Sequence, residues 1–558
     1  MIPRPARLRL LVSPSSAHLP SLTVSRPFTR KLSSSRSDNG ELKIAIIGSG
    51  PSGFYTASRI LNSIPKDTPN GDNVQVHMYE RLPTPYGLVR YGVAPDHPEV
   101  KNCQHKFDEL SSDPRFKFFG NVLLSSQPSS SQTESTPSTA LSPYTYPHAV
   151  RLSFDDILPY YSTLILTYGA SLSNPLSSVS GSSSSSNPLK NVLPALGLVS
   201  WYNSHPAFSD LPINLEGIEE VSVIGQGNVA LDVARILLKP VKSLSQTDLS
   251  DDVLDVLSKS TIKRLRVVGR RGPGQVAFTT KEFREMISIP NVSYKGVNQD
   301  LMEQAKDMVG NERMRKRLLS LMEKPVSNDQ GDKEFILDFL KSPKGFIPSS
   351  RDRSKVGEIE WNINQLLSTT PSTPTPPLSQ VSAVPSGNEV IARTTGETVT
   401  QQADLIVESV GYRSEPLTGE HGGWVLPFDV KRGRVRNVSG RVVDKDGVVI
   451  PGIYAAGWAA RGPVGVIAST MHDAYSLSDQ LLDDHFSNPS STSGPLNPNP
   501  EQGIPEALTK AQRQGGIVVD LEGWEKIDNA ERERAKIMGN GKEREKFRKV
   551  EEMLAVLS

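Results

Sequence analysis

The sequence predicts an α/β fold of the doubly wound type that contains two separate Rossmann-like dinucleotide-binding domains. Three observations predict it: short apolar runs bounded by glycine, helical patterns after several of these runs, and two glycine-rich turns that each join such a run to a helix about 177 residues apart. A strand followed by a helix, repeated along a chain, is the order typical of parallel sheets covered by helices.

Seven apolar runs have the length and composition of strands that are buried on both faces. They cover residues 42–50, 74–80, 162–170, 221–227, 265–271, 404–412 and 452–458. Apolar side chains recur at helical spacing in residues 54–64, after the first run, and in residues 228–238, after the fourth. These runs are therefore expected to form the strands of parallel sheets, with helices packed on them.

Three stretches rich in Ser, Pro and Thr interrupt these patterns. They cover residues 125–143, 172–188 and 366–386. Such residues bury too little apolar surface to offset the entropy lost on ordering, so all three are predicted to be flexible surface loops.

The first glycine-rich turn contains Gly48, Gly50 and Gly53, between an apolar run and a helical pattern. In a dinucleotide fingerprint the first glycine permits the tight turn, the second lets the backbone approach a pyrophosphate, and the third allows close helix packing. The phosphates then meet a helix N-terminus. Glu80 ends the next run, where a carboxylate can accept hydrogen bonds from ribose hydroxyls.

The second turn, Gly225-Gln-Gly-Asn-Val-Ala230, has the same setting, but the run after it ends in Arg270 and Arg271 rather than in an acid. Two guanidinium groups suit a 2′-phosphate, which favours NADP(H) over NAD(H). The alternative is an exposed arginine pair without a ligand. With one pocket assigned to NADP(H), FAD is the natural occupant of the other, because a hydride donor needs an acceptor.

Composition excludes several other classes of site. The 558 residues include one cysteine, Cys103, so an internal disulfide, a CxxC redox pair and a four-cysteine metal or iron–sulfur site are all impossible. No metal site is predicted. No apolar run reaches about 18 residues, so a membrane span is not expected.

Residues 1–37 carry seven basic residues and no acid, and they are rich in Ser and Leu. This composition predicts a mitochondrial transit peptide, which we assign to residues 1–38; the alternative is a disordered basic tail. Removing the seven positive charges of residues 1–37 from the net charge of +1 leaves −6, so a basic docking surface would have to be local.

Four longer motifs resemble the mitochondrial adrenodoxin reductase family, the NADPH:ferredoxin reductase type. They are GLVRYGVAPDHPEVKN at 87–102, GQGNVALDVARILL at 225–238, GRRGPGQVAFTTKEFREM at 269–286 and GWAARGPVGVIASTMHDA at 457–474. The resemblance covers about residues 42–555 apart from the Ser- and Pro-rich insertions. It implies an NADP domain, residues 173–410, inserted into a discontinuous FAD domain of residues 39–172 and 411–558.

The resemblance also implies site residues. The FAD contacts would be Ser52, Glu80, Leu88, Val122, Trp458, Gly465, Val466 and Ile467. The NADP contacts would be Gln226, Gly227, Asn228, Val229, Arg270, Arg271 and Glu282, with Gly465 near the nicotinamide. Around Gly465 the sequence is typical of a loop that enters a helix, whose positive end could face the flavin.

Three residues are candidates for catalysis. Trp458 could cover the flavin, or it could be an ordinary packed aromatic residue. His97 could handle a proton or orient the flavin together with Asp232, or it could be a structural histidine. Hydride transfer itself needs no protein acid or nucleophile, because the cofactors carry the chemistry.

The implied reaction takes electrons from NADPH through FAD, one at a time, to a small acidic [2Fe–2S] ferredoxin. That ferredoxin would serve mitochondrial cytochrome P450 or iron–sulfur cluster and haem biosynthesis. Arg313 and Arg317, one helical turn apart, are the expected docking residues, although a solvated basic helix face reads the same way. The expected location is the mitochondrial matrix, peripheral to the inner membrane, with no nucleic-acid partner.

Two rival functions share this pattern. An FAD- and NADPH-dependent monooxygenase would use the same two folds to activate oxygen. A non-catalytic NADP(H)-sensing protein would bind the nucleotide without passing electrons on.

Overall fold

The structure, a computed structural model, describes residues 41–68, 70–104, 108–125, 146–310, 312–326, 331–369, 389–417, 426–465, 467–486, 494–539 and 541–558. The predicted transit peptide lies outside the described residues, as do residues 126–143 and 370–386 of the predicted loops. The loop prediction is wrong for Ser125 and for residues 366–369, which are the last residues of strands.

A seven-stranded sheet forms the centre of the first domain, in the order β20-β21-β22-β6-β1-β2-β3. Its strands from β22 to β3 are parallel, and β20 and β21 are antiparallel additions at one edge. The strands are β1 (Leu42–Ile47), β2 (Val74–Tyr79), β3 (Phe116–Phe119), β6 (Thr163–Leu166), β20 (Asn437–Val438), β21 (Arg441–Val443) and β22 (Val449–Ala455).

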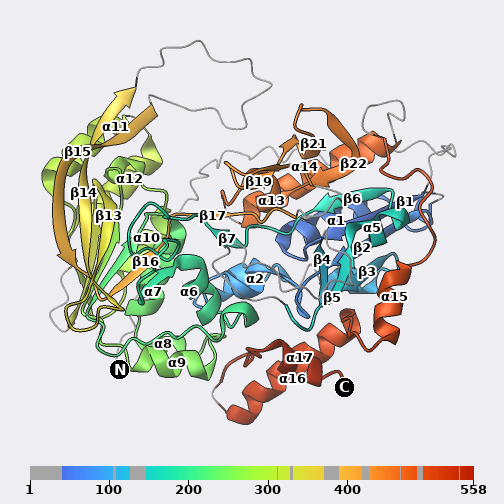
Figure 1. The fold of residues 1–558 in the computed structure, drawn as a ribbon, viewed down its shortest axis with the longest axis horizontal. Coiled ribbons are helices and arrows are strands. Elements are labelled where there is room, and N and C mark those ends of the chain that lie inside the picture. Colours follow the sequence, from blue (N-terminus) through green and yellow to red (C-terminus); the bar gives the residue numbers. More distant parts are fainter. Residues whose placement is uncertain are drawn as a thin grey trace, which may run out of the picture. The chain divides into compact units, whose positions relative to one another are not determined.

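A six-stranded, fully parallel sheet forms the centre of the second domain, in the order β11-β12-β10-β9-β16-β8. Its strands are β8 (Val192–Pro194), β9 (Glu220–Ile224), β10 (Arg264–Val268), β11 (Val292–Tyr294), β12 (Lys333–Asp338) and β16 (Leu405–Glu408). All seven apolar runs are thus strands of two separate parallel sheets, which confirms the predicted fold class (Figure 1).

The chain crosses between the two sheets twice, after β6 and after β16. The crossings pair with each other as a short antiparallel ladder of β7 (Leu172–Ser173) and β17 (Tyr412–Arg413). The second sheet is therefore built from one continuous insertion into the first domain.

Three further small sheets lie among the described residues. The antiparallel meander comprises β13 (Lys341–Pro348), β14 (Val356–Thr369) and β15 (Glu389–Gln402), and two pairs comprise β4 (Val122–Ser125) with β5 (Val150–Ser153) and β18 (Phe428–Asp429) with β19 (Arg434–Val435).

The helices of the first domain are α1 (Pro51–Ser63), α2 (Leu88–Tyr91), α3 (Pro98–Lys101), α5 (Phe154–Ile157), α13 (Gly457–Arg461), α14 (Ile467–Phe486), α15 (Glu506–Arg513), α16 (Leu521–Met538) and α17 (Val550–Ala555). Those of the second are α6 (Ala195–Tyr202), α7 (Asn228–Leu238), α8 (Val241–Leu244), α9 (Asp251–Ser258), α10 (Thr280–Ile287), α11 (Gln299–Val309) and α12 (Arg313–Met322). The 3-10 turns are η1 (Glu109–Ser112), η2 (Leu158–Tyr160), η3 (Pro206–Phe208) and η4 (Pro273–Gln275). No helix among the described residues is both long and apolar enough to cross a bilayer.

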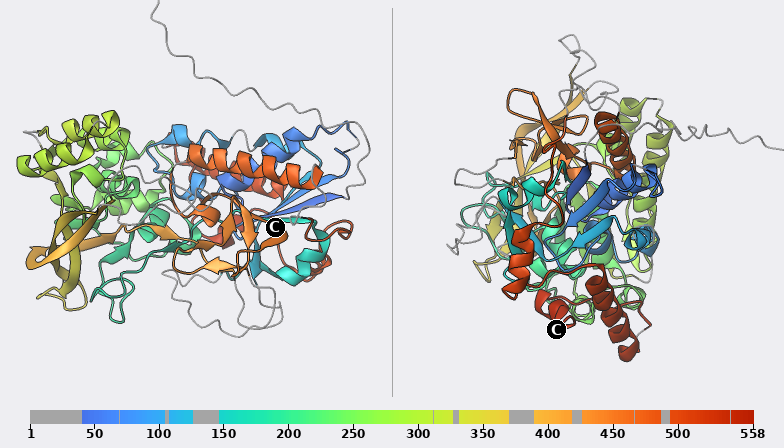
Figure 2. Two further views of the ribbon diagram at one scale, coloured as in Figure 1. Left: turned by 90° about the horizontal axis from the view of Figure 1, so that it is seen from above. Right: turned by 90° about the vertical axis from the view of Figure 1, so that its right-hand side faces the viewer.

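Burial explains why β1 reads as a continuous apolar run. All six of its residues are buried, because helices and loops cover both faces of the first sheet. On one face α1 turns Phe54, Ile60 and Leu61 inward, and α14 packs along α1 (Figure 2). The predicted helices at 54–64 and 228–238 correspond to α1 and α7.

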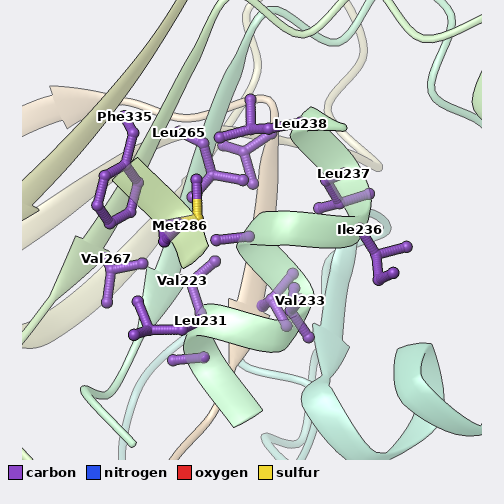
Figure 3. Packing of buried hydrophobic residues seen from close by; sticks show 14 of the residues in the cluster. Val223, Leu231, Val233, Ile236, Leu237, Leu238, Leu265, Val267, Met286 and Phe335 are labelled. Carbon is purple, nitrogen blue, oxygen red and sulfur yellow. The ribbon is translucent and has the colours of Figure 1, made fainter. Parts of the chain in front are cut away.

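The core of the second domain forms where α7 and α10 pack on the sheet. Leu231 and Ile236 of α7 lie in one buried cluster with Val223 and Val267 of the strands and with Met286 of α10 (Figure 3). This packing fixes the start of α7, and with it the second glycine turn, against the sheet.

The prediction of a flexible surface loop at 172–188 is wrong. Val179 is buried against Phe346 and Trp361 of the meander, in a cluster that covers one face of the second sheet. The serines are also engaged, because Ser182 Oγ donates to the Leu176 carbonyl and the Ser183 hydroxyl donates to Glu408. A few apolar side chains with hydrogen-bonded hydroxyls therefore order a segment whose composition suggests disorder.

The buried imidazole of His77 predicts an acid-sensitive contribution to stability. Its Nδ1 lies 2.9 Å from Tyr161 Oη, and burial, together with the charges of Lys117 and Lys43, lowers its pKa to about 3. The unfolded histidine takes up a proton below about pH 6.5. Stability is therefore fully present above that pH and is lost as the pH falls from 6.5 towards 3. Between pH 7 and 5.5 the loss is about 1.2 kcal/mol.

The measurement is the free energy of unfolding by urea at pH 8, 7 and 5.5 for the native chain and for His77→Gln, which does not titrate. The native chain should lose about 1.2 kcal/mol more than the variant on going from pH 7 to 5.5. The two should change in parallel between pH 8 and 7. Parallel behaviour over the whole range would contradict a neutral His77.

Candidate functional site

A cavity opens at the carboxyl ends of the strands of the first sheet. Seven of the residues predicted to contact FAD line it: Gly48, Gly50, Ser52, Glu80, Leu88, Trp458 and Ile467. Ligands of open parallel sheets bind at this edge. Ile467 is the first residue of α14, so the positive end of this 20-residue helix borders the cavity, as its sequence indicates.

The three glycines of the first turn differ in what surrounds them. A Cβ atom at Gly48, whose φ is +103°, would lie 2.5 Å from Tyr168 Cα, and one at Gly53 would lie 2.3 Å from the Gly48 carbonyl oxygen. A Cβ atom at Gly50 would meet nothing within 4 Å. Protein packing therefore requires glycine at the outer two positions, whereas the space beside Gly50 is left open, as a pyrophosphate would need. Gly50 is the N-cap residue of α1, and no side chain caps the amide groups at this end of the helix.

Glu80 is held in place by the same turn. Its Oε2 accepts hydrogen bonds from Ser49 N at 3.0 Å and Ser49 Oγ at 2.7 Å, and its Oε1 accepts one from Leu82 N at 3.2 Å. A carboxylate oxygen can accept a second bond, so Oε1 can also receive a ribose hydroxyl.

The second domain supplies part of the cavity wall, which the sequence reasoning missed. Leu196 and Ser200 of α6 line it, followed by His205 and Phe208. Burial, aided by the positive charge of Arg81, lowers the pKa of His205 to about 3, so this imidazole is neutral. Its Nδ1 accepts a hydrogen bond from Ala207 N. The cavity therefore lies between the two domains.

Three of the described residues predicted to contact FAD do not line the cavity: Gly53, Val122 and Gly465. Val122 is buried in β4, where its N–H donates to the Glu80 carbonyl at 2.8 Å. Val122 therefore fixes the backbone of Glu80 and does not contact the cavity. Gly465 adopts a φ of +84°, and a Cβ there would lie 2.2 Å from Ser469 Oγ. Val466 lies outside the described residues.

The second glycine turn repeats the geometry of the first. A Cβ atom at Gly225, whose φ is +120°, would lie 2.1 Å from the Ser409 carbonyl oxygen, whereas one at Gly227 would meet nothing within 4 Å. Asn228 and Val229 begin α7, and Asn228 Oδ1 accepts a hydrogen bond from Thr279 N. The Gln226 side chain donates to the Asp338 carbonyl, so it supports the turn and leaves backbone groups to face a ligand.

Arg270 and Arg271 follow β10 at the same edge of the second sheet, and both are exposed. Among the described residues neither guanidinium group forms a hydrogen bond or an ion pair. Partial burial and the positive charges of Arg270 and Arg315 hold the pKa of Arg271 below its usual value. Local charges thus disfavour a cation here, and a phosphate dianion would relieve this repulsion.

The second turn and the cavity of the first domain meet at a small apolar cluster of Ala170, Leu196 and Tyr412. Val229, at the start of α7, and Trp458, in the cavity wall, both pack against it. The ring centroids of Trp458 and Tyr412 are 6.2 Å apart. A nucleotide at the second turn would therefore have its reactive end close to the cavity of the first.

A polar cluster lies beside this meeting point, and Arg235 of α7 is at its centre. The guanidinium group is fully buried and donates to Asp96 Oδ2 at 2.7 Å, to Asp232 Oδ1 at 2.7 Å and to Glu282 Oε2 at 2.9 Å. Asp96 belongs to the first domain, and the other two carboxylates belong to the second. One buried cation thus joins the domains.

His97 and Asp232 both belong to this cluster. The bonding partner of His97 is Glu285, with Nε2 and Oε2 2.6 Å apart. Burial and the charge of Glu282 raise the pKa of Asp232 to about 6, against the opposing effects of Arg235 and His97. Glu282, predicted to contact NADP, binds Arg235. Trp458 is separate from this group and lines the cavity.

Comparison with known proteins gives a consistent result. No protein-family model matches the chain. Curated relatives named mitochondrial NADPH:adrenodoxin oxidoreductase include those of Drosophila melanogaster, 36% identical over 92% of this chain and 93% of the relative, and of Homo sapiens, 33% identical over 92% of each. The Arabidopsis thaliana protein of the same name is 33% identical over 97% of this chain and 99% of its own.

The chain belongs to the NADPH:adrenodoxin oxidoreductase family. Among solved structures it is similar to Mycobacterium tuberculosis FprA in complex with NADPH, with a TM-score of 0.72 and 31% identity over 92% of this chain and 99% of that one.

The resemblance to this family pointed to Arg313 and Arg317 for partner docking, and both lie on α12 and are exposed. The opposite side of α12 buries Leu318, Leu319 and Met322 in the second domain. The helix therefore presents its basic side chains on an anchored element.

The two glycine environments predict different outcomes for two similar substitutions. Gly53→Ala places a methyl group against a backbone carbonyl, so it should destabilise the protein by about 1–3 kcal/mol even without a ligand. Gly50→Ala meets open space, so the stability of the flavin-free chain should change by less than about 1 kcal/mol. Its affinity for FAD should nevertheless fall at least about tenfold, because the methyl group blocks the approach of the pyrophosphate.

Urea unfolding of the flavin-free chain gives the first quantity, and FAD titration followed by flavin fluorescence gives the second. The control is Gly345→Ala in β13 of the second domain, because a Cβ atom there would meet nothing within 4 Å. Gly169 and Gly217 are unsuitable, because their φ angles of +75° and +77° would strain an alanine. Native FAD affinity in Gly50→Ala would show that the pyrophosphate lies elsewhere.

Proposed function

We propose that this chain is a flavoprotein reductase that takes electrons from NADPH through FAD and passes them one at a time to a [2Fe–2S] ferredoxin. Membership of the NADPH:adrenodoxin oxidoreductase family supports this function over a monooxygenase or a nucleotide sensor. The observation that carries it is the pair of glycine turns, each open at its central glycine. The second turn and the cavity beside the first turn meet at Ala170, Leu196 and Tyr412.

FAD is assigned to the cavity of the first domain. The turn at Gly50 and the N-terminus of α1 would hold the pyrophosphate, and Glu80 would bind the ribose of the adenosine. The N-terminus of α14 would stabilise negative charge on the isoalloxazine ring. When bound, FAD accepts a hydride and releases electrons singly, which is the chemistry that the side chains lack.

NADP(H) is assigned to the turn of Gly225 to Ala230. Arg270 and Arg271 would bind the 2′-phosphate by charge-assisted hydrogen bonds. Val229 would then direct the nicotinamide towards the apolar cluster, where Trp458 and Tyr412 exclude water from the path of the hydride.

The reaction releases one proton for each NADPH that is consumed. We assign this proton to the polar cluster, where His97 Nε2 is paired with Glu285 Oε2 and the Asp232 carboxyl has a pKa of about 6. Arg235 has a positioning role, because it holds Asp232 and Glu282 on one guanidinium group.

The relatives are named mitochondrial, and we assign this chain to the mitochondrion, with residues 1–38 as its transit peptide. We further propose a matrix location peripheral to the inner membrane. The domain boundaries that we propose are 39–172 and 411–558 for FAD and 173–410 for NADP, which places both limits at the β7–β17 ladder.

The function is tested by an anaerobic titration of the purified holoprotein with NADPH. The flavin absorbance near 450 nm should bleach with about one equivalent of NADPH and return on addition of about two equivalents of oxidised [2Fe–2S] ferredoxin, since hydride carries two electrons. NADH at the same concentration serves as the control. A colourless protein, or a bleached flavin that ferredoxin does not reoxidise, would reject the reductase.

Docking through Arg313 and Arg317 predicts a selective effect of salt. With saturating NADPH, raising NaCl from 50 to 300 mM should slow ferredoxin reduction at least about fivefold, because an acidic partner is attracted through screened charges. Ferricyanide reduction should change far less.

Two variants localise the effect. Arg313→Gln and Arg317→Gln should each slow ferredoxin reduction and flatten its salt dependence, whereas Arg353→Gln, an exposed arginine on the loop after β13, should not. Equal salt sensitivity of the ferredoxin and ferricyanide reactions would count against docking on α12.

A further inference from the structure

Arg315 lies on the same helix as the proposed docking residues but turns towards a different neighbour. Two positions along an α-helix correspond to about 200°, so its side chain leaves α12 on nearly the opposite side from Arg313 and Arg317. Its Nη1 donates a hydrogen bond to the carbonyl of Gly274. Arg315 therefore reaches the loop that follows β10 instead of extending into solvent with its neighbours.

That loop is the one that carries Arg270 and Arg271. Gly274 is the central residue of η4, three positions after Arg271, and η4 is packed against α11 and α12. At the start of the loop, a Cβ atom on Gly269 would lie 2.0 Å from the Gln226 side chain, so the loop abuts the second glycine turn. Arg315 is thereby brought to the side of the second turn where the 2′-phosphate is assigned.

The guanidinium group of Arg315 is held in position and still has donors to spare. Its Nε lies 2.7 Å from Glu312 Oε2, and Nη1 binds Gly274, whereas Nη2 forms no hydrogen bond with any described residue. About half of the side chain is exposed, at 48%. The two N–H groups of Nη2 are therefore available to an anion.

The loop also has an excess of positive charge. Arg270, Arg271 and Arg315 gather around one loop, and Glu312 is the only carboxylate that pairs with any of them among the described residues. The charges of Arg270 and Arg315 both contribute to lowering the pKa of Arg271, so the three cations repel one another. A phosphate dianion would convert this repulsion into attraction.

We propose that Arg315 is a third ligand for the 2′-phosphate of NADP(H), beside Arg270 and Arg271, and that it helps to select NADP(H) over NAD(H). The inference rests on the proposed NADP site. It makes α12 a helix with two functions, since Arg313 and Arg317 on one side face the electron acceptor and Arg315 on the other faces the electron donor.

The experiment isolates the 2′-phosphate by comparing two fragments of the nucleotide. Adenosine 2′,5′-bisphosphate carries the 2′-phosphate and 5′-AMP lacks it, and isothermal titration of the holoprotein gives the dissociation constant of each. In Arg315→Gln the affinity for the bisphosphate should fall about five- to tenfold, the size of one charge-assisted hydrogen bond at a half-exposed site. The affinity for 5′-AMP should be unchanged.

Two further variants make the result decisive. Arg271→Ala should lower the affinity for the bisphosphate roughly tenfold to a hundredfold. Arg353→Gln removes the same type of charge from another exposed loop of the second domain and should change neither fragment.

The outcomes separate the inference from the function on which it rests. If Arg315→Gln lowered the affinity for both fragments equally, Arg315 would only stabilise the loop, and the inference would be overturned. An effect of Arg271→Ala without any effect of Arg315→Gln would also overturn it while leaving the NADP site in place. If Arg315→Gln and Arg271→Ala both kept the native ratio of affinities for the two fragments, the proposed NADP site itself would be overturned.

Discussion

The burial of Arg235 is the constraint on which the relation between the two domains depends. A fully buried guanidinium group requires partners for its charge, and it finds them in Asp96 of the first domain and in Asp232 and Glu282 of the second. Removing one partner from such a group leaves an uncompensated buried charge, so the cluster permits only a narrow range of orientations. Because Arg235 is on α7, the helix that begins at the second glycine turn, that turn is oriented relative to the first domain by the same contact.

The two glycine turns share one backbone conformation but differ in the side chains beside it. In both turns the first glycine has a positive φ and abuts backbone of the segment that follows a neighbouring strand, and in both the central glycine faces open space. The turns differ in the residues beyond the next strand. Glu80 is held by the amide and the hydroxyl of Ser49 in the first turn, whereas the guanidinium groups of Arg270 and Arg271 have no partner among the described residues. In the proposed assignment the common backbone binds the pyrophosphate, and the residues after the next strand distinguish the two dinucleotides.

Much of this arrangement could be predicted from the sequence because it depends on local rules. Seven apolar runs are strands, the two periodic segments are helices α1 and α7, and both glycine turns lie between a strand and a helix. Contacts between distant segments could not be predicted in this way. The pairing of His97 with Glu285 joins residues 188 positions apart. The sequence shows Arg235 only as one residue of a helical pattern, although its position three residues after Asp232 is compatible with an ion pair on one helix face. Composition also misled for residues 172–188, because Val179 and a few hydrogen-bonded serines are enough to order them against the meander.

The ladder of β7 and β17 has a consequence for how such a molecule could have been assembled. Ser173 and Tyr412 are direct partners in it, so the long segment between them leaves and re-enters the host chain at almost the same point. A host whose cut ends are already adjacent needs only a short connection to close again, and that closure costs little chain entropy. A complete nucleotide-binding module could thus have been spliced into an ancestral single-cofactor protein at a surface turn without disturbing the register of the recipient sheet.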